Sequence, residues 1–194
     1  IIVYQNLGLY KNPKDMRGRS NLTVILWRFV YSYLFRPSPK FFWGFRRLLL
    51  RLFGAVIGNK AEFSPTCKIT YPWFLETSEY CWVGDETVIY NLAKIKLGNH
   101  VALAHRVSLC CGSHLIDRES FDIVLKPITI EDEVWIANDV FIGPGVVVGR
   151  GAVVGARSSV YKDLEAGYIY LGSPAEKLKK RDVEFISTAG VSHD

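Results

Sequence analysis

The side chains that could do chemistry in this 194-residue chain are four histidines and four cysteines. His114 has the most informative setting, because it closes the run CCGSHLI at the point where a sequence repeat breaks. An imidazole exchanges a proton near neutral pH, so a histidine there is suited to general-base catalysis. A single histidine in a turn is more often a surface or packing residue, and the pattern around His114 has to decide between the two.

The other histidines give little support for a metal site. His100 and His105 stand five residues apart, but residues 1–99 contain no histidine that could complete a zinc site. The chain also has no CxxC motif and no paired Cys/His zinc spacing. His193 lies in a polar C-terminal tail and is expected to be inert. We therefore expect a protein that needs no metal.

Two cysteines offer a different chemistry, covalent catalysis by a thiolate. Cys110 and Cys111 stand shortly before His114, at repeat positions typical of small buried or turn residues. That placement favours a packing role over a nucleophilic one. Adjacent cysteines rarely pair with each other, and the chain does not have the pattern of a small secreted scaffold. We therefore expect free thiols in a reducing cytoplasm.

A six-residue repeat defines the elements that must position His114. One column of aliphatic residues recurs every six positions, and a second column of small or aliphatic residues follows it by four. The first column is Ile130, Ile136, Ile142, Val148, Val154 and Val160, and the second is Val134, Val140, Val146, Ala152, Ser158 and Leu164. The same period continues upstream in broken frames, through Ile57, Phe63, Ile69 and Leu75, then Val83, Ile89 and Ile95, then Leu97, Leu103 and Leu109. Trp73 and Ser113 fall in the upstream part of the second column.

Each six-residue unit is long enough for a short strand and a turn. Three units close one triangular coil, and coils stack at about 4.8 Å, the spacing of hydrogen-bonded strands. Glycines after the inward residue, such as Gly143, Gly149 and Gly155, mark corners at which a positive φ is expected. The pattern predicts an all-β fold, a parallel β-helix over residues 57–171 with roughly five to six coils. The stretch LIDRESFDIVLKPIT, at about 115–129, is predicted to be a loop extruded from it.

Residues 1–56 are predicted to form an N-terminal helical arm. One helix is expected over residues 21–35, capped by Ser20 or Asn21, and another over about 40–53. The second helix gathers Phe41, Phe42, Phe45, Leu48, Leu49 and Leu52 on one face and leaves Arg46, Arg47 and Arg51 off it. Neither helix is long enough to span a bilayer. The arm either caps the open end of the β-helix or covers a partner subunit, or it lies on an anionic membrane through residues 20–53, with the three arginines toward the lipid.

Charge is distributed unevenly along the chain. The formal net charge is +5, and a hydrophobic content of 49% excludes a disordered chain. Asp15 is the only acid before Ile57, and the C-terminal tail, residues 172–194, carries a basic run from Lys177 to Arg181. These segments are either solvated faces or surfaces with affinity for the phosphates of a cofactor or a membrane. We find no nucleic-acid-binding motif and no signal peptide.

Three stretches of the sequence resemble the hexapeptide acetyltransferases. They are IYNLAKIKLGNHVALAHRVSLCCGSHLID, KPITIEDEVWIANDVFIGPGVVVGRGAVVGARSSVYKD and YLGSPAEKLKK. The resemblance is strongest to the colanic acid branch found in exopolysaccharide gene clusters, and the upstream stretch RPSPKFFWGFRRLLLRLFGAVIG agrees with that branch. The galactoside and maltose acetyltransferases are nearby relatives. Covering residues 20–182, the resemblance implies a left-handed β-helix and a homotrimer with each active site between two subunits.

The resemblance also implies roles for individual residues. His114 would be the catalytic base, and Asn91 would hold the acceptor hydroxyl. The residues expected to contact acetyl-CoA are Trp135 in the pantetheine channel, Asn138 at the thioester end, Ala156 through its backbone, Tyr161 and Lys162 near the nucleotide, and Lys177 and Lys179 near the 3′-phosphate. Glu176 stands where relatives often carry arginine, so the chain departs from the family at the 3′-phosphate.

The implied function is an acetyl-CoA-dependent O-acetyltransferase that modifies a sugar hydroxyl in exopolysaccharide or capsule biosynthesis by direct transfer. The acceptor could be a lipid-linked oligosaccharide, which would place the protein in the cytoplasm or peripherally at the inner face of the membrane. Two alternatives remain open, a free-sugar or serine O-acetyltransferase and a non-enzymatic β-helix scaffold. A zinc hydratase of the same fold would need a third histidine upstream of His100, and residues 1–99 contain none.

Overall fold

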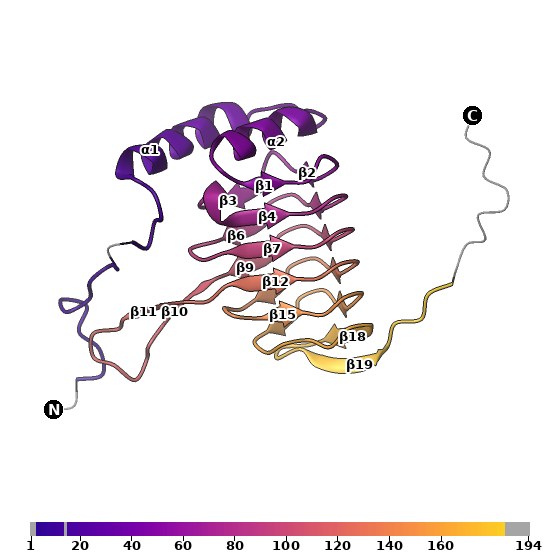
Figure 1. The fold of residues 1–194 in the computed structure, drawn as a ribbon. Helices are drawn as coiled ribbons and strands as arrows, with labels where there is room; N and C mark the ends of the chain where they lie inside the picture. Colours follow the sequence, from indigo (N-terminus) through magenta and orange to yellow (C-terminus); the bar gives the residue numbers. More distant parts are fainter. Residues whose placement is uncertain (1–2, 14, 185–194) are drawn as a thin grey trace.

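A three-sided stack of short strands carries two helices across one end and a protruding hairpin on one side (Figure 1). This computed structural model describes residues 3–13 and 15–184. Strands of successive coils pair in parallel and form three sheets. The predicted β-helix with an N-terminal helical segment and an extruded loop is confirmed, and its left-handed sense is the one that the family resemblance implies.

Each coil contributes one strand to each of three sheets. Sheet 1 contains β1 (Val56–Ile57), β4 (Leu75–Thr77), β7 (Ile95–Leu97), β12 (Ile128–Ile130) and β15 (Val147–Val148). Sheet 2 contains β2 (Glu62–Phe63), β5 (Trp82–Val83), β8 (Ala102–Leu103), β13 (Trp135–Ile136), β16 (Val153–Val154), β18 (Tyr168–Leu171) and β19 (Glu176–Lys180). Sheet 3 contains β3 (Lys68–Ile69), β6 (Val88–Tyr90), β9 (Ser108–Cys110), β14 (Phe141–Ile142) and β17 (Ser159–Val160). Five coils are therefore complete, and β18 belongs to a sixth.

The aliphatic columns fill the interior of the prism, as predicted. All six residues of the unbroken first column are at most 1% exposed. The parallel registers stack Ile136 on Leu103 and Ile142 on Leu109, so like side chains lie above one another through the coils. Burying one such side chain contributes roughly 1.5–3 kcal/mol, and the prism interior is therefore the main source of stability.

Two residues of the upstream second column were predicted wrongly. Trp73 lies in a short 3-10 helix, η2 (Pro72–Phe74), and is half-buried. Ser113 is exposed on the extruded hairpin. Both stand where extra residues interrupt the six-residue frame, so the spacing continues in the sequence while the chain has already left the prism.

The corner glycines are needed for close approach between coils rather than for a positive φ. Gly143, Gly149 and Gly155 are absent from the left-handed region of φ that we predicted for them. A Cβ on Gly149 would lie only 2.5 Å from the backbone nitrogen of Ala166 in the next coil. Positive φ occurs elsewhere in the corners, for example at Asp139, where φ is 59°.

Two helices lie across the first coil (Figure 1). α1 (Asn21–Val30) begins after Ser20, whose hydroxyl accepts a hydrogen bond from the N–H of Thr23 at 3.2 Å. A π-helical turn, η1 (Tyr31–Phe35), extends it to the predicted end. α2 (Trp43–Leu52) begins three residues later than predicted, because residues 40–42 are not helical. Among the described residues, no helix has the length and apolar character needed to cross a bilayer.

The face of α2 that packs on the prism differs from the predicted one. Of the six apolar residues assigned to that face, only Leu49 is buried, while Phe41, Phe42, Phe45, Leu48 and Leu52 are exposed. Arg46, which was placed off the packing face, is instead fully buried. The assignment of the α2 arginines to a lipid-facing surface was therefore wrong.

The reason lies in the backbone of the first coil. Throughout the stack, an N–H of one coil donates to a carbonyl of the next, as Gly58 does to Thr77 and Glu62 to Cys81. Carbonyls of the first coil have no earlier coil to donate to them, so other donors must replace it. The replacements are Arg46 Nε to Phe63 O at 2.7 Å, Arg47 Nη1 to Ala61 O at 2.9 Å, Arg51 Nη2 to Ile57 O at 2.6 Å and Trp27 Nε1 to Ile69 O at 3.0 Å. The helices thus cap the end of the prism.

The extruded segment is a hairpin rather than an irregular loop. β10 (Gly112–His114) pairs antiparallel with β11 (Ile123–Leu125), and His114 lies opposite Ile123. The excursion begins at Gly112, before the predicted start of 115, and β12 returns to the prism at Ile128. The six-residue spacing continues through Ser113, so the sequence pattern did not mark the start of the hairpin.

The C-terminal residues are also more ordered than a tail. β19 runs antiparallel to β18 and extends sheet 2 at the end of the prism opposite the helices. Lys177 and Lys179 therefore lie on a strand of sheet 2. Residues 185–194, which include His193, fall outside the described part of the chain.

Candidate functional site

His114 occupies the end of β10, where the hairpin leaves the prism, and its ring is held in one orientation. Its Nδ1 lies 2.7 Å from the carbonyl oxygen of Phe121. A carbonyl can only accept a hydrogen bond, so this contact places the proton of a neutral imidazole on Nδ1. The lone pair of Nε2 is then available to accept a proton from a bound hydroxyl. This is the tautomer that a general base requires.

Two aromatic rings hold the imidazole from different directions. The ring of Phe121 stacks on His114 with centroids 4.1 Å apart and planes 5° from parallel. The centroid of the Tyr10 ring lies 5.8 Å from that of the imidazole, and the two ring planes are inclined by 57°. The segment that carries Tyr10 is tied to the hairpin by the N–H of Asn6, which donates to the carbonyl of Glu119 at 2.8 Å. The N-terminal segment therefore forms part of the histidine's surroundings.

Sequence reasoning missed both aromatic neighbours. Phe121 lies within the stretch that was predicted to be a loop, and its φ of 51° gives it a backbone conformation that no pattern signalled. Tyr10 is an isolated tyrosine more than a hundred positions from His114. Nothing in the sequence links the two residues.

Asn91 lies at the same edge of the prism as His114, between sheet 3 and sheet 1. Its side chain is fully buried and bridges two coils, with Oδ1 accepting from the N–H of Tyr71 at 3.0 Å and Nδ2 donating to the carbonyl of Tyr71 at 2.6 Å. Because Asn91 is fully buried, an acceptor could reach its remaining N–H or lone pair only if the residues that cover it move. Its role in acceptor binding stays a prediction.

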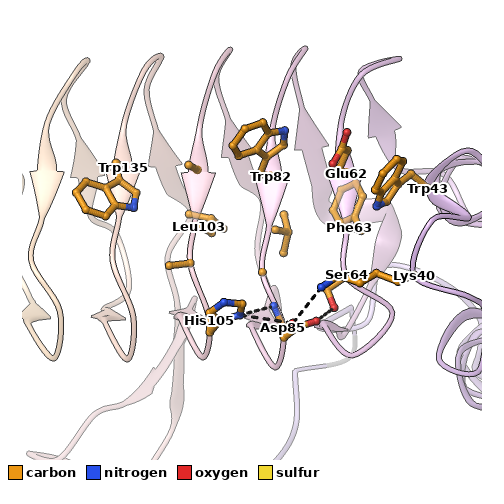
Figure 2. Close-up of a pocket in the computed structure, with 14 residues that line it drawn as sticks. Lys40, Trp43, Glu62, Phe63, Ser64, Trp82, Asp85, Leu103, His105 and Trp135 are labelled. Atoms are coloured by element: carbon orange, nitrogen blue, oxygen red, sulfur yellow. Dashed lines mark hydrogen bonds and ion pairs between the residues drawn. The ribbon is translucent and has the colours of Figure 1, made fainter.

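Trp135 faces outward from sheet 2 and is 49% exposed. It borders a groove of about 410 Å³ along that sheet, with Trp82 two strands away and the small Ala102 between them. Figure 2 shows both indole rings on the same face of sheet 2, with Asp85 and His105 at the turns of two successive coils beside it. An apolar channel with polar groups along one edge suits the pantetheine arm that was predicted to lie beside Trp135.

The corner beside this groove, between sheets 2 and 3, carries two further predicted contacts. Asn138 is exposed, and its Oδ1 accepts a hydrogen bond from the N–H of His105 at 3.3 Å. Ala156 is exposed one coil further along the same corner. Both residues therefore lie on the edge of the prism that borders the groove. Their contacts with acetyl-CoA stay predictions.

The residues assigned to the nucleotide end lie nearer the C-terminal end of the prism. Tyr161 and Lys162 are exposed at the edge between sheets 3 and 1. Lys177 pairs with Glu165 at 2.6 Å and lies 4.1 Å from the ring centroid of Tyr168, and the hydrogen bond to Glu165 is the main cause of its raised pKa. Lys179 is exposed on β19.

The structure does not bring these groups into one site within a single chain. His114, Asn91 and Lys162 follow strands of sheet 3, at the edge shared with sheet 1. Trp135 lies on sheet 2, and Asn138 and Ala156 lie at the edge between sheets 2 and 3. His114, the predicted base, and the predicted donor groove thus occupy different edges of the prism.

Three of the four thiols are poorly placed for covalent chemistry, whereas Cys110 is half-buried. Cys111 is fully buried, and burial raises its pKa to about 11. Burial likewise raises the pKa of Cys81 to about 11 and that of Cys67 to about 12. A thiol in this state carries almost no thiolate at neutral pH. Within residues 3–13 and 15–184, His, Cys, Asp and Glu form no group of three that could hold a metal ion.

Known proteins similar to this chain share both its sequence pattern and its fold. Residues 127–162 match the family described as bacterial transferase hexapeptide (six repeats). WcaF of Escherichia coli (strain K12), assigned as a colanic acid biosynthesis acetyltransferase, is 43% identical over 177 residues, which cover 91% of this chain and 97% of WcaF. An assigned acetyltransferase of Dictyostelium discoideum is 30% identical over 185 residues, covering 91% of this chain and 92% of its own.

Two solved structures have the same architecture. A maltose O-acetyltransferase from Clostridium difficile 630 superposes with a TM-score of 0.76 at 24% identity, covering 87% of this chain and 96% of that one. The hexapeptide-repeat acetyltransferase VCA0836 of Vibrio cholerae, in complex with acetyl-CoA, superposes with a TM-score of 0.73 at 25% identity, covering 88% and 89%.

This chain belongs to the hexapeptide-repeat acetyltransferases. Within that family, its similarity to the colanic acid biosynthesis acetyltransferase WcaF extends over nearly the whole length of both chains. The predicted resemblance is confirmed, and acetyltransferases of this family use acetyl-CoA as the acetyl donor.

Proposed function

We propose that this protein transfers the acetyl group of acetyl-CoA directly to a sugar hydroxyl, with His114 as the general base. The observation that carries the proposal is the hydrogen bond between His114 Nδ1 and the carbonyl of Phe121, because it leaves Nε2 free to accept a proton. The half-buried position of His114 also limits the access of water to the ring.

The chemistry needs only one proton carrier. An acceptor hydroxyl is far too weakly acidic to ionise at neutral pH, so it must lose its proton as it attacks. In the proposed step, Nε2 takes that proton while the hydroxyl oxygen bonds to the thioester carbonyl carbon. The carbon–sulfur bond then breaks, CoA leaves as the thiolate, and the imidazolium returns the proton to the sulfur. The buried, protonated Cys111 supports direct transfer over an acyl-enzyme.

We further propose that the active site forms between subunits of a homotrimer. Within one chain, His114 and the groove beside Trp135 lie on different edges of the prism, and a neighbouring prism could bring its own groove to His114. Cyclic assemblies of identical chains repeat such a contact at every interface. One trimer would then contain three equivalent sites.

The acceptor is proposed to belong to exopolysaccharide or capsule assembly. The support is the similarity to WcaF, which is assigned to colanic acid biosynthesis. A lipid-linked oligosaccharide would suit the apolar N-terminal arm, and the protein would then work in the cytoplasm, in peripheral contact with the membrane.

A subunit-mixing experiment tests base and assembly together. His114→Ala and Trp135→Ala variants should each be nearly inactive alone. Refolding equal amounts of the two variants together should restore roughly a quarter of the wild-type transfer to a sugar acceptor. In a randomly mixed trimer, about one interface in four pairs a subunit with intact His114 with a neighbour that has intact Trp135. No restoration in trimers shown to be mixed would reject a shared site, and full activity of His114→Ala alone would reject the base.

A further inference from the structure

We propose that the outer face of the two N-terminal helices docks on an anionic lipid bilayer. This outer face is defined by Leu22, Ile25, Phe29, Phe41, Phe45 and Leu52, all of which are exposed. The proposal extends the function given above, since a lipid-linked acceptor would be held at the same surface.

The first helix is apolar on two opposite sides. Val24, Trp27 and Val30 are buried on one side. Leu22 and Ile25 are 75% and 62% exposed, and they continue through Phe29 along a stripe with three- and four-residue spacing. Packing on the prism accounts for the buried stripe alone. A second continuous apolar stripe indicates a second apolar partner.

The second helix adds further exposed apolar side chains at the same end of the prism. Its arginines and Leu49 are turned toward the first coil, so the opposite side of the helix faces away from the prism. On that opposite side, Leu52 is 70% exposed, and Phe41, which precedes the helix, is 69% exposed. Figure 1 shows both helices lying across the end of the stack, which leaves the outer face open at that end of the molecule.

The charge around this surface selects the kind of partner. Residues 16–61 contain nine lysines and arginines and no aspartate or glutamate. Three of these cations, the α2 arginines, are hydrogen-bonded to the prism, and Lys40 forms an ion pair with Asp85 of the prism at 3.9 Å. Arg28 and Arg36 remain exposed beside the apolar residues. An apolar, aromatic surface with a basic rim is complementary to anionic headgroups over acyl chains. Two copies of this face would instead bring cations against cations.

Vesicle sedimentation of the full chain tests the proposal. The protein should sediment with vesicles of phosphatidylcholine mixed with phosphatidylglycerol, and about thirtyfold less tightly with phosphatidylcholine alone, since Arg28 and Arg36 should each add roughly 1 kcal/mol near an anionic surface. Replacing Arg28 and Arg36 with glutamine should remove most of the preference for phosphatidylglycerol.

Variants of the apolar stripes separate docking from simple attraction of charge. The triple variant Ile25→Gln, Phe29→Gln and Phe41→Gln keeps every cation and should lose at least about tenfold in vesicle affinity, because it removes most of the apolar area available for insertion. The control triple variant Tyr80→Gln, Leu178→Gln and Val183→Gln removes comparably exposed side chains away from this face and should sediment like the wild type. Circular dichroism checks that each variant is folded.

Three outcomes would overturn the proposal. They are wild-type protein that stays in the supernatant with phosphatidylglycerol vesicles, a stripe variant that sediments like the wild type, and light scattering that shows the stripes joining two copies in solution. Transfer to a soluble sugar separates this proposal from the proposed function. The stripe variant should keep wild-type transfer while losing vesicle binding, whereas a wild type that binds vesicles but transfers no acetyl group would reject only the enzymatic function.

Discussion

The prism and the surroundings of His114 are built in contrasting ways. The prism repeats one packing solution through successive coils, and each interior residue is supported by like residues above and below. The imidazole of His114 is instead held by the ring and the carbonyl of Phe121, seven residues away in the same hairpin, and by Tyr10 from a segment distant in sequence. The comparison indicates that substitutions in the prism should change stability, whereas substitutions around His114 should change turnover and leave the fold nearly intact.

The largest expected effect is at the base itself. His114→Ala should lower turnover by about 10² to 10⁴ fold, the usual contribution of a positioned general base, while acetyl-CoA still binds. Steady-state kinetics with a sugar acceptor and calorimetric titration of acetyl-CoA measure the two properties. The matched control is Cys111→Ala, which should reduce stability through a small cavity and retain turnover. Loss of turnover in the cysteine variant alone would point to an acyl-enzyme.

The second-largest effect is expected at Arg46, the buried arginine of the helical cap. Arg46→Ala should lower the free energy of unfolding by about 3 kcal/mol, since it removes a buried guanidinium and strands the buried carbonyl of Phe63 and the partly buried carbonyl of Pro39. Arg47→Ala should cost only about 1 kcal/mol, because Arg47 is partly exposed and loses one hydrogen bond, to Ala61. Urea unfolding measures both. Equal losses would show that the cap does not depend on the buried guanidinium.

A smaller change in turnover is expected at the ring that stacks on the base. Phe121→Ala should reduce kcat roughly tenfold by loosening the imidazole, with little change in KM for acetyl-CoA. Phe121→Tyr retains the stacking and should restore most of the rate. An unchanged kcat with an altered melting temperature would assign Phe121 to stability alone.

The smallest effect is a gain in stability inside the prism. Among the described residues, the hydroxyl of Thr77 is buried without a hydrogen-bond partner. Thr77→Val should therefore raise the free energy of unfolding by about 1 kcal/mol. Thr87→Val is the matched control and should be destabilising, since the hydroxyl of Thr87 donates to the carbonyl of Ala104 at 2.9 Å. Thermal unfolding distinguishes the two signs.

The same contrast explains which features the sequence could predict. A column such as Ile130 to Val160 is visible in sequence because each coil repeats one geometry, so the prism, its period and its interior were within reach. His114 was identifiable only because it stands where the period breaks and matches a family motif. The role of Arg46 could not be predicted, because helical periodicity assigns charged residues to solvent. It contains no information on the carbonyls of the first coil, which need hydrogen-bond donors from outside the prism. Tyr10 was beyond prediction, because its contact joins segments with no shared pattern.

The position of the helices across the end of the stack has a consequence for which hydroxyl can be reached. His114 follows β9, the third strand of sheet 3 from the capped end. Two strand spacings and one helix layer therefore separate its coil from the outer face by about 20 Å. With that face on a bilayer, the rigid prism would hold His114 at a fixed distance from the membrane surface. If the acceptor is a lipid-linked glycan, as proposed above, a hydroxyl would be selected by its height above the headgroups, and the length of the glycan would become part of the specificity.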